Sequence, residues 1–583
     1  LSRSASVFRF GNNAYKFNNK QHVGVVELRS NFNSSMSNNL ILGYSRIRDN
    51  RETAGSLFPQ ITILNIDNVS SNSVQFGSER SSVANELDQD IFEITNNFKW
   101  NVNNHTFTFG THNEFFSFRN LFINNLNGRW DFNSVADYLA NNPARVRATY
   151  SIVPGDDRPA AEFNAAQLGF YAQGESELIR NFRVTYGARI DIPIIGDKPL
   201  RNEKVEASFP GYRTDRTPSG QVLFSPRLGL NYDINGDRSI ILRGGAGIFT
   251  GRVPFVWLSN QFGNSGMLFG AVDARNAAIN NGNGFDPNVD NQQNMAAGLP
   301  RTEVNLISEN FKIPQVARFN LAGDFKLPYG IQATLEGIYS KTINNVVYSD
   351  INISNSESSI SSNLSGGADL RPSYSGRRIN SDDFTNVILL DNTNKGYTYS
   401  LTAQLQKSFE NGFSAMVAYT NGKSKSINDG ASSTALSNWE FVQIVNSANS
   451  PDLATSNFDI RHRIIGNIGY TFSYGKDKMF ATGINLFYAG TSGQPFTYLY
   501  NGDVNGDGAF NNDLIYIPRD RSEINLVNLV RNDNSIVTPD QQWEDLDAFI
   551  NSSDYLSKRR GQYTVRNGAR MPCQDQFVLR IYQ

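Results

Sequence analysis

The residues with the clearest capacity for chemistry are acidic and amide side chains near the C-terminal end of the chain. The segment Asp503-Val504-Asn505-Gly506-Asp507-Gly508-Ala509 places three oxygen-bearing side chains at alternate positions, and its glycine permits a sharp turn around a cation. Calcium prefers oxygen ligands of this kind, and Ala509 would add its backbone carbonyl, as position 7 of an EF-hand loop does. Position 12 is Leu514 instead of the usual Glu, so Asp513 would have to replace that ligand.

Two interpretations of this segment remain open. In the first, Asp503, Asn505, Asp507, Ala509 and Asp513 bind one Ca²⁺ ion, which has a structural rather than a catalytic role. In the second, the segment is an Asx-rich loop that needs no metal, because its side chains bond to its own backbone.

Other reactive residue types are too scattered to indicate an active site. The four histidines, His22, His105, His112 and His462, lack the spacing of a zinc site, and Cys573 has no local histidine partner. We therefore predict that the protein is not an enzyme. Its 53 Lys and Arg residues nearly balance 55 Asp and Glu residues, so the charge does not indicate nucleic-acid binding.

The elements that must position these residues are β-strands. Between Phe182 and Ile192 every even-numbered residue is apolar or aromatic, whereas the odd-numbered residues are Arg, Thr, Gly, Arg and Asp. Successive side chains of a strand point to opposite faces, so such a segment has one apolar and one polar surface. The pattern recurs along most of the chain. It is typical of a transmembrane barrel, which faces lipid outside and water inside.

Short turns join pairs of these segments into predicted antiparallel hairpins. Asn235-Gly236 and Asn411-Gly412 are examples, and such pairs favour the positive φ angles of tight turns. We count about sixteen strands in this way. The clearest predicted pairs are 227–234 with 240–248, 318–327 with 331–340, 399–409 with 413–420, and 464–472 with 480–488.

Long polar segments separate the hairpins. Short turns that alternate with long loops are typical of outer-membrane barrels, in which the turns are periplasmic and the loops extracellular. No run of about 18 apolar residues occurs, so the sequence predicts no transmembrane helix. The long segments are 49–88, 120–160, 250–312, 350–396, 424–458 and 501–574.

The last of these segments contains a predicted helix. Thr538 is a suitable N-cap, Pro539 suits the first turn, and Gln541 can reach back to the cap. The helix would continue through Phe549 and Ile550. It would either form a docking surface for a partner or pack onto its own barrel.

Several motifs resemble the Oar-like branch of TonB-dependent outer-membrane receptors, and the similarity extends from about residue 20 to the end. The matching segments are 86–91, 105–114, 120–123 with Gly128 and Phe132 following, Asp459-Ile460-Arg461-His462-Arg463, Asn512-Asp513-Leu514-Ile515-Tyr516-Ile517-Pro518 and the spaced Tyr, Arg and Gly residues between 555 and 572. The resemblance implies a 22-stranded barrel in the bacterial outer membrane, with a plug domain inside it. It also implies outer-membrane lipid and TonB as partners, and a surface lipoprotein or other outer-membrane subunit as a further partner.

No plug domain and no TonB box are found in the sequence. We therefore interpret residues 1–583 as an outer-membrane β-barrel that is the C-terminal part of a longer receptor, with 501–574 as a long extracellular loop. The predicted function is uptake or binding of an unidentified substrate. The alternatives are a plugless pore or scaffold barrel within a larger outer-membrane complex, and a cell-surface β adhesion protein. The Asn-, Ser- and Gly-rich loops suit glycans, peptides and protein partners equally.

Overall fold

The computed structural model describes residues 6–583 except 69–71, 253–254, 280–281, 296–300, 357, 361–366, 375, 377 and 532–534. Parts of four predicted long loops, 49–88, 250–312, 350–396 and 501–574, therefore lie outside the described residues.

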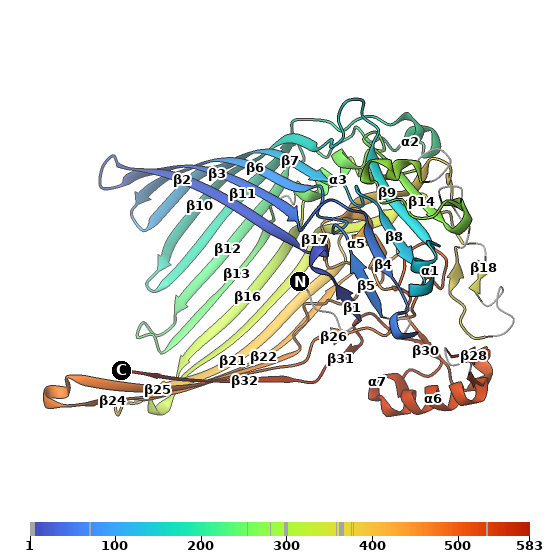
Figure 1. The fold of residues 1–583 in the computed structure, drawn as a ribbon. Coiled ribbons are helices and arrows are strands. Elements are labelled where there is room, and N and C mark those ends of the chain that lie inside the picture. Colours follow the sequence, from blue (N-terminus) through green and yellow to red (C-terminus); the bar gives the residue numbers. More distant parts are fainter. Residues whose placement is uncertain are drawn as a thin grey trace.

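One large, strongly curved antiparallel sheet dominates the molecule (Figure 1). It contains eighteen strands. Fifteen of them form an antiparallel meander, in which each strand pairs with the next of the fifteen along the chain. The fifteen are β2 (Tyr15–Asn31), β3 (Met36–Thr53), β6 (Asn85–Val102), β7 (His105–Phe122), β10 (Ala161–Ile179), β11 (Phe182–Ile195), β12 (Leu223–Asp233), β13 (Ile240–Thr250), β16 (Gln315–Lys326), β17 (Gln332–Asp350), β21 (Gly396–Ser408), β22 (Phe413–Ser426), β24 (His462–Tyr474), β25 (Phe480–Thr491) and β32 (Gln574–Tyr582).

The predicted all-β barrel architecture is confirmed, and so are the four predicted hairpins, β12–β13, β16–β17, β21–β22 and β24–β25. The predicted division of faces is also found. On β11 the apolar side chains of Tyr186 and Ile190 are exposed on the outer face, whereas Asp191 is buried on the inner face. Phe170 and Phe224 on the neighbouring strands are exposed beside Ile190. This outer apolar surface is the one that faces lipid.

The two margins of the sheet are β2 and β32. Among the described residues β2 pairs only with β3, and β32 pairs only with β25, so the eighteen-stranded barrel sheet contains no β2–β32 ladder. Nearly every residue of β2 and all nine residues of β32 are exposed. Figure 1 shows the two strands on opposite margins of the curved sheet.

Loop segments gather at one end of the sheet and build a second, smaller sheet there (Figure 1). Its core contains Ile61, Trp130, Phe132 and Val146, all fully buried. The six strands, in spatial order, are β1 (Val7–Arg9), β5 (Ser73–Phe76), β4 (Gln60–Ile63), β8 (Arg129–Phe132), β9 (Arg145–Ser151) and β14 (Phe269–Arg275).

Short helices from the loops pack against the inner wall of the large sheet. Helix α3 (Phe255–Gly263) places Phe255 against Phe116 and Phe118 of β7, and α5 (Ala435–Glu440) contributes the fully buried Trp439 to the same core. Burial of these large aromatic side chains stabilises the packing of the loops against the inner wall. The remaining attached strands are β15 (Thr302–Ile307), β20 (Phe384–Thr393) and β23 (Ala454–Thr455).

The predicted C-terminal loop helix is confirmed as α6 (Pro539–Ser552), followed by α7 (Asp554–Ser557). Thr538 and Gln541 form a reciprocal capping box, as the sequence predicts. Ile550 packs with Ile517 and Leu556 of the same loop, whereas Phe549 remains exposed. None of the described helices has the length and apolarity needed to cross a membrane.

The other described elements are short. They comprise two helices and four two-stranded ribbons: α1 (Val135–Leu139), α2 (Glu203–Ser208), β18 (Ser358–Ser359) with β19 (Pro372–Ser373), β26 (Pro495–Phe496) with β31 (Ala569–Arg570), β27 (Tyr516–Ile517) with β30 (Gln562–Tyr563), and β28 (Leu529–Val530) with β29 (Ile536–Val537).

Candidate functional site

The segment 503–513 lies in the loop between β25 and β32 and is anchored at its end. Asp513 bridges to Ile444, and Leu514 bridges to Leu499, while Ala509 is fully buried in the core that contains Trp439. Asn505, Asp507, Asn512 and Asp513 have no more than 1% of their surface exposed. The predicted metal-binding residues therefore lie within the packed loops and not at a free loop tip.

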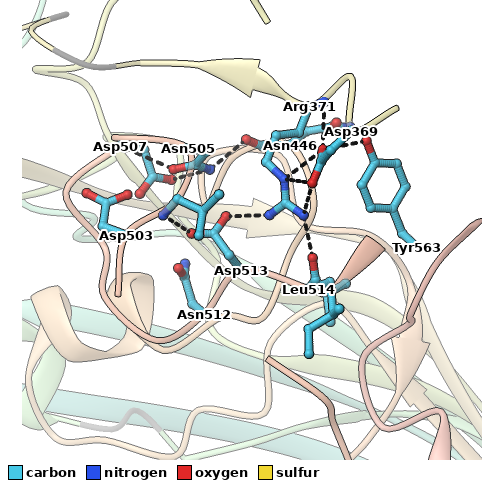
Figure 2. A network of polar contacts seen from close by, with 12 residues as sticks. Asp369, Arg371, Asn446, Asp503, Asn505, Asp507, Asn512, Asp513, Leu514 and Tyr563 are labelled. Atoms are coloured by element: carbon cyan, nitrogen blue, oxygen red, sulfur yellow. Dashed lines mark hydrogen bonds and ion pairs between the residues drawn. The ribbon is translucent and has the colours of Figure 1, made fainter. Parts of the chain in front are cut away.

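The acidic and amide side chains of this segment bind backbone amides around the turn (Figure 2). Asp503 accepts hydrogen bonds from the amides of Gly506 (2.7 Å) and Gly508 (2.9 Å). Asn505 accepts one from the amide of Asp507, whose own carboxylate accepts one from Ala509, both at 2.9 Å. Carboxylates and amides that close turns in this way are typical of Asx turns.

Arg371 neutralises Asp513, a contact that no motif or spacing in the sequence predicts. Its guanidinium donates to Asp513 Oδ1 at 2.9 Å and to the carbonyl of Leu514 at 2.5 Å, and it also pairs with Asp369 at 2.9 Å. Its side chain is fully buried, and the rings of Tyr500 and Tyr563 lie 5.2 and 5.4 Å from it. Figure 2 shows this buried cation beside the acidic turn.

Arg371 does not offset the whole negative charge of the turn. The pKa of Asp507 is raised to about 6, mainly by burial and in smaller part by the nearby carboxylates of Asp503 and Asp513. Burial also raises the pKa of Asp503 and that of Asp513, although Arg371 opposes the latter. A cation or a proton at this turn would relieve the charge repulsion.

Calcium at this turn stays a prediction. Among the described residues no group of three or more His, Cys, Asp or Glu side chains is arranged to hold a metal ion. Amide and carbonyl ligands such as Asn505 and Ala509 are outside that description, so a mixed oxygen site is still consistent with it. The backbone contacts of the turn are common to both interpretations.

The polar inner wall of the barrel carries ion pairs at positions that the alternation predicts. Arg189 pairs with Asp191 at 2.7 Å on β11. Arg243 of β13 pairs with Asp324 of β16 at 2.9 Å and with Glu336 of β17 at 3.4 Å. The pairs of Arg243 link three adjacent strands of the wall, whereas the pair of Arg189 lies within one strand.

The long alternating strands, the lipid-facing apolar surface and the loops gathered at one end together define an outer-membrane β-barrel. A family model described as "Outer membrane beta barrel domain" matches residues 2–577. The chain belongs to this family, and its location is the bacterial outer membrane.

Solved structures of outer-membrane transporters have a similar fold. The outer membrane transporter YddB from Escherichia coli aligns with a TM-score of 0.52 and 11% identity, over 85% of this chain and 53% of that chain. The ferric enterobactin receptor PfeA from Pseudomonas aeruginosa, in a mutant form, aligns at 0.39 and 11% identity, over 86% and 61%. The chain thus spans little more than half the length of these structures. No curated protein sequence matches it.

Proposed function

We propose that the chain is the barrel portion of an outer-membrane receptor or transporter of the TonB-dependent type, in the Oar-like branch that its motifs resemble. Two observations support this proposal: the membership of the outer-membrane barrel family and the loop domain that covers one end of the barrel. The structurally similar YddB is an outer membrane transporter, which agrees with the proposal. The substrate enters from the loop side and remains unidentified.

The observation that carries the proposal is the pair of unpaired sheet margins. A strand at the margin of a sheet leaves every second backbone N–H and C=O without a partner. Inside a bilayer each such group costs several kcal/mol, so membrane sheets close into barrels. Strands β2 and β32 therefore require further strands beside them.

The directions of β2 and β32 determine whether the number of additional strands is odd or even. Fifteen successive antiparallel strands place β2 and β32 in the same direction, so direct closure would make a parallel pair. Single-chain bacterial barrels close with an even number of antiparallel strands. An odd number of additional strands is needed, and the 22-stranded barrel implied by the resemblance meets this condition.

The alternative of a plugless pore made of this sheet alone requires direct pairing of β2 with β32. The scaffold alternative requires that strands of another subunit fill the gap. The alternative of a cell-surface adhesion protein does not explain an apolar outer surface over so many strands.

Cysteine crosslinking in the native outer membrane tests the proposal. In a Cys573→Ser background, Leu579→Cys on β32 is combined with Val26→Cys or Leu28→Cys on β2, whose side chains share the outer face. One intervening strand separates the two margins by about 9.6 Å, beyond the roughly 7 Å that a disulfide can bridge. We expect no disulfide in either combination.

The matched control is Leu486→Cys with Leu579→Cys, because these residues are direct partners on β25 and β32. It should crosslink efficiently. A β2–β32 disulfide at the control yield would contradict the proposal and favour the plugless pore. The intact mass of the crosslink-free protein then separates strands of a longer chain from strands of a second subunit.

A further inference from the structure

A partly open cavity with polar and apolar walls lies where the loop helices meet the smaller sheet. Its volume is about 260 Å³, and its wall is built from the end of β7, from α3, β14 and β15, and from the start of α5. A second cavity of about 320 Å³ shares Phe122, Asn260, Asn264 and Phe269 with it. Their combined space approaches that of small-molecule sites, which are roughly 300–1,000 Å³.

Glu303 lines this cavity without a cationic partner among the described residues. Its Oε1 accepts hydrogen bonds from the side-chain amides of Asn305 at 2.8 Å and Asn264 at 3.5 Å, whereas its Oε2 accepts none from the described part of the chain. The pKa of Glu303 is raised to about 7, mainly by burial and in smaller part by the negative charges of Asp350 and Glu440. β15 lies among the loops, outside the ladder of membrane-spanning strands.

Asparagine oxygens without donors occur on the cavity wall and beside Glu303. Asn124 Oδ1 and Asn125 Oδ1, on the cavity wall, are enclosed and have no hydrogen-bond partner. Asn305 is 2% exposed, its amide nitrogen holds Glu303, and its Oδ1 is also unpartnered. A buried acceptor without a donor costs about 1–3 kcal/mol, so this arrangement is unfavourable while the cavity contains no donor group.

The charge partners of the neighbouring acids lie elsewhere. Asp350 is held by Arg378 at 2.7 Å, so that arginine is already neutralised. Glu440, at the end of α5, has Arg80 as the cation that lowers its pKa, while burial raises it. Of the described residues that line the cavity, Glu303 is the acidic one, and its Oε2 accepts no hydrogen bond from the described part of the chain.

We propose that this cavity binds the primary ammonium group of an organic ligand, with Glu303 as its counter-ion and the amide oxygens of Asn124 and Asn125 as further acceptors. An ammonium group carries three donors and no acceptor, which complements a site made of acceptors. The carbon skeleton of the ligand lies against Phe122, Phe269 and Leu436. The site deepens the proposed receptor function by naming a substrate class, and in that respect it rests on the proposed function.

An inorganic cation fits the site less well. The described residues offer no cluster of three or more acidic or histidine ligands, here or elsewhere. Carboxylate and amide oxygens with an adjoining aromatic wall are instead a combination that recognises an amine attached to an apolar body.

Binding of benzylamine to the purified, detergent-solubilised full chain at pH 8.5 tests the proposal, with calorimetry and the melting temperature as readouts. Benzyl alcohol and benzoate are the neutral and anionic counterparts of the probe. We expect benzylamine alone to bind and to raise the melting temperature. Glu303→Gln should weaken binding at least tenfold, whereas Glu309→Gln, an exposed acid paired with Arg216, should leave it unchanged.

Glu303→Gln is expected to fold, because it replaces an uncompensated charge by a neutral amide, and heat-modifiable migration verifies the barrel in each variant. Equal binding of benzylamine and benzyl alcohol, or undiminished binding to folded Glu303→Gln, would overturn the proposal. So would stabilisation by CaCl₂ in place of benzylamine. These binding results do not depend on transport, so failure here leaves the β2–β32 crosslinking result unaffected.

Discussion

At the scale of single residues, the loops are held by a few buried charges. Arg371 has no exposed side-chain surface and pairs with Asp369, two residues before it, and with Asp513, 142 residues after it. A buried ion pair contributes little net stability, but loss of one partner leaves an uncompensated charge in the interior. The guanidinium also fits between two tyrosine rings, a contact that lysine would not reproduce.

Arg371→Met is therefore expected to destabilise the loop domain by about 3–5 kcal/mol. Limited proteolysis and hydrogen exchange of residues 369–371 and 499–517 measure the change. Arg519→Met is the matched control, since Arg519 is an exposed i,i+4 partner of Glu523 and its loss should change stability by less than about 1 kcal/mol. Equal protection of the loop in both variants would show that Arg371 is dispensable.

The raised pKa of Asp507 predicts how the acidic turn responds to pH. Its pKa is about 6 in the folded protein and 3.8 ordinarily, so protonation stabilises the fold. That stabilisation is complete below about pH 4 and is lost as the pH rises through 6. Hydrogen exchange of residues 503–513, corrected for intrinsic rates, should show weaker protection at pH 7.5 than at pH 5.

If calcium binds this turn, it should restore the protection at pH 7.5, because the ion replaces the proton as the neutralising charge. Asp503→Ala and Asp507→Ala would then abolish the calcium effect. An unchanged exchange pattern with and without calcium in the unsubstituted protein would establish the metal-free Asx loop instead.

At the scale of elements, local signals place ends and turns. The predicted start of α6 is found because Thr538 and Gln541 exchange hydrogen bonds with each other's backbone amides, at 3.3 and 3.0 Å. The hairpin turns contain residues that tolerate positive φ, such as Gly236 at +76° and Gly412 at +85°. In Gly412 an added Cβ would meet the carbonyl of Thr471 at 2.1 Å, so the close strand approach also requires glycine.

Thr538→Ala should destabilise the first turn of α6 by about 1 kcal/mol, since it removes the N-cap acceptor. Hydrogen exchange of residues 539–543 measures this loss. Glu544→Ala, at an exposed position in the middle of the helix, is the control and should leave exchange at the first turn unchanged. A similar effect of both substitutions would mean that tertiary packing, rather than the cap, starts the helix.

At the scale of the whole molecule, the barrel wall and the loop domain have different sources of stability. The wall is stabilised by continuous hydrogen-bonded ladders in a bilayer that excludes water. Its unpaired margins, β2 and β32, therefore require additional strands beside them. The loop domain instead has buried aromatic cores, which contain Trp130 and Trp439, and it contains the cavity lined by Glu303. The two parts meet on the inner wall at the loop end of the barrel, where Phe116 and Phe118 contact α3.

The sequence by itself determined the strands, their two faces, the four hairpins and the α6 cap, because alternation and turn residues act within a few positions of the chain. The ion pair of Arg189 with Asp191 on the lumen side could likewise be predicted from the sequence, because both residues lie on one predicted polar face. The tertiary structure decided what surrounds the predicted acidic turn. Asp513 pairs with Arg371, 142 residues earlier in the chain, whereas Glu303 pairs with none of the cations among the described residues. Contacts over such separations depend on the curvature of the barrel and on the inward folding of its loops. Local sequence patterns predict neither of these.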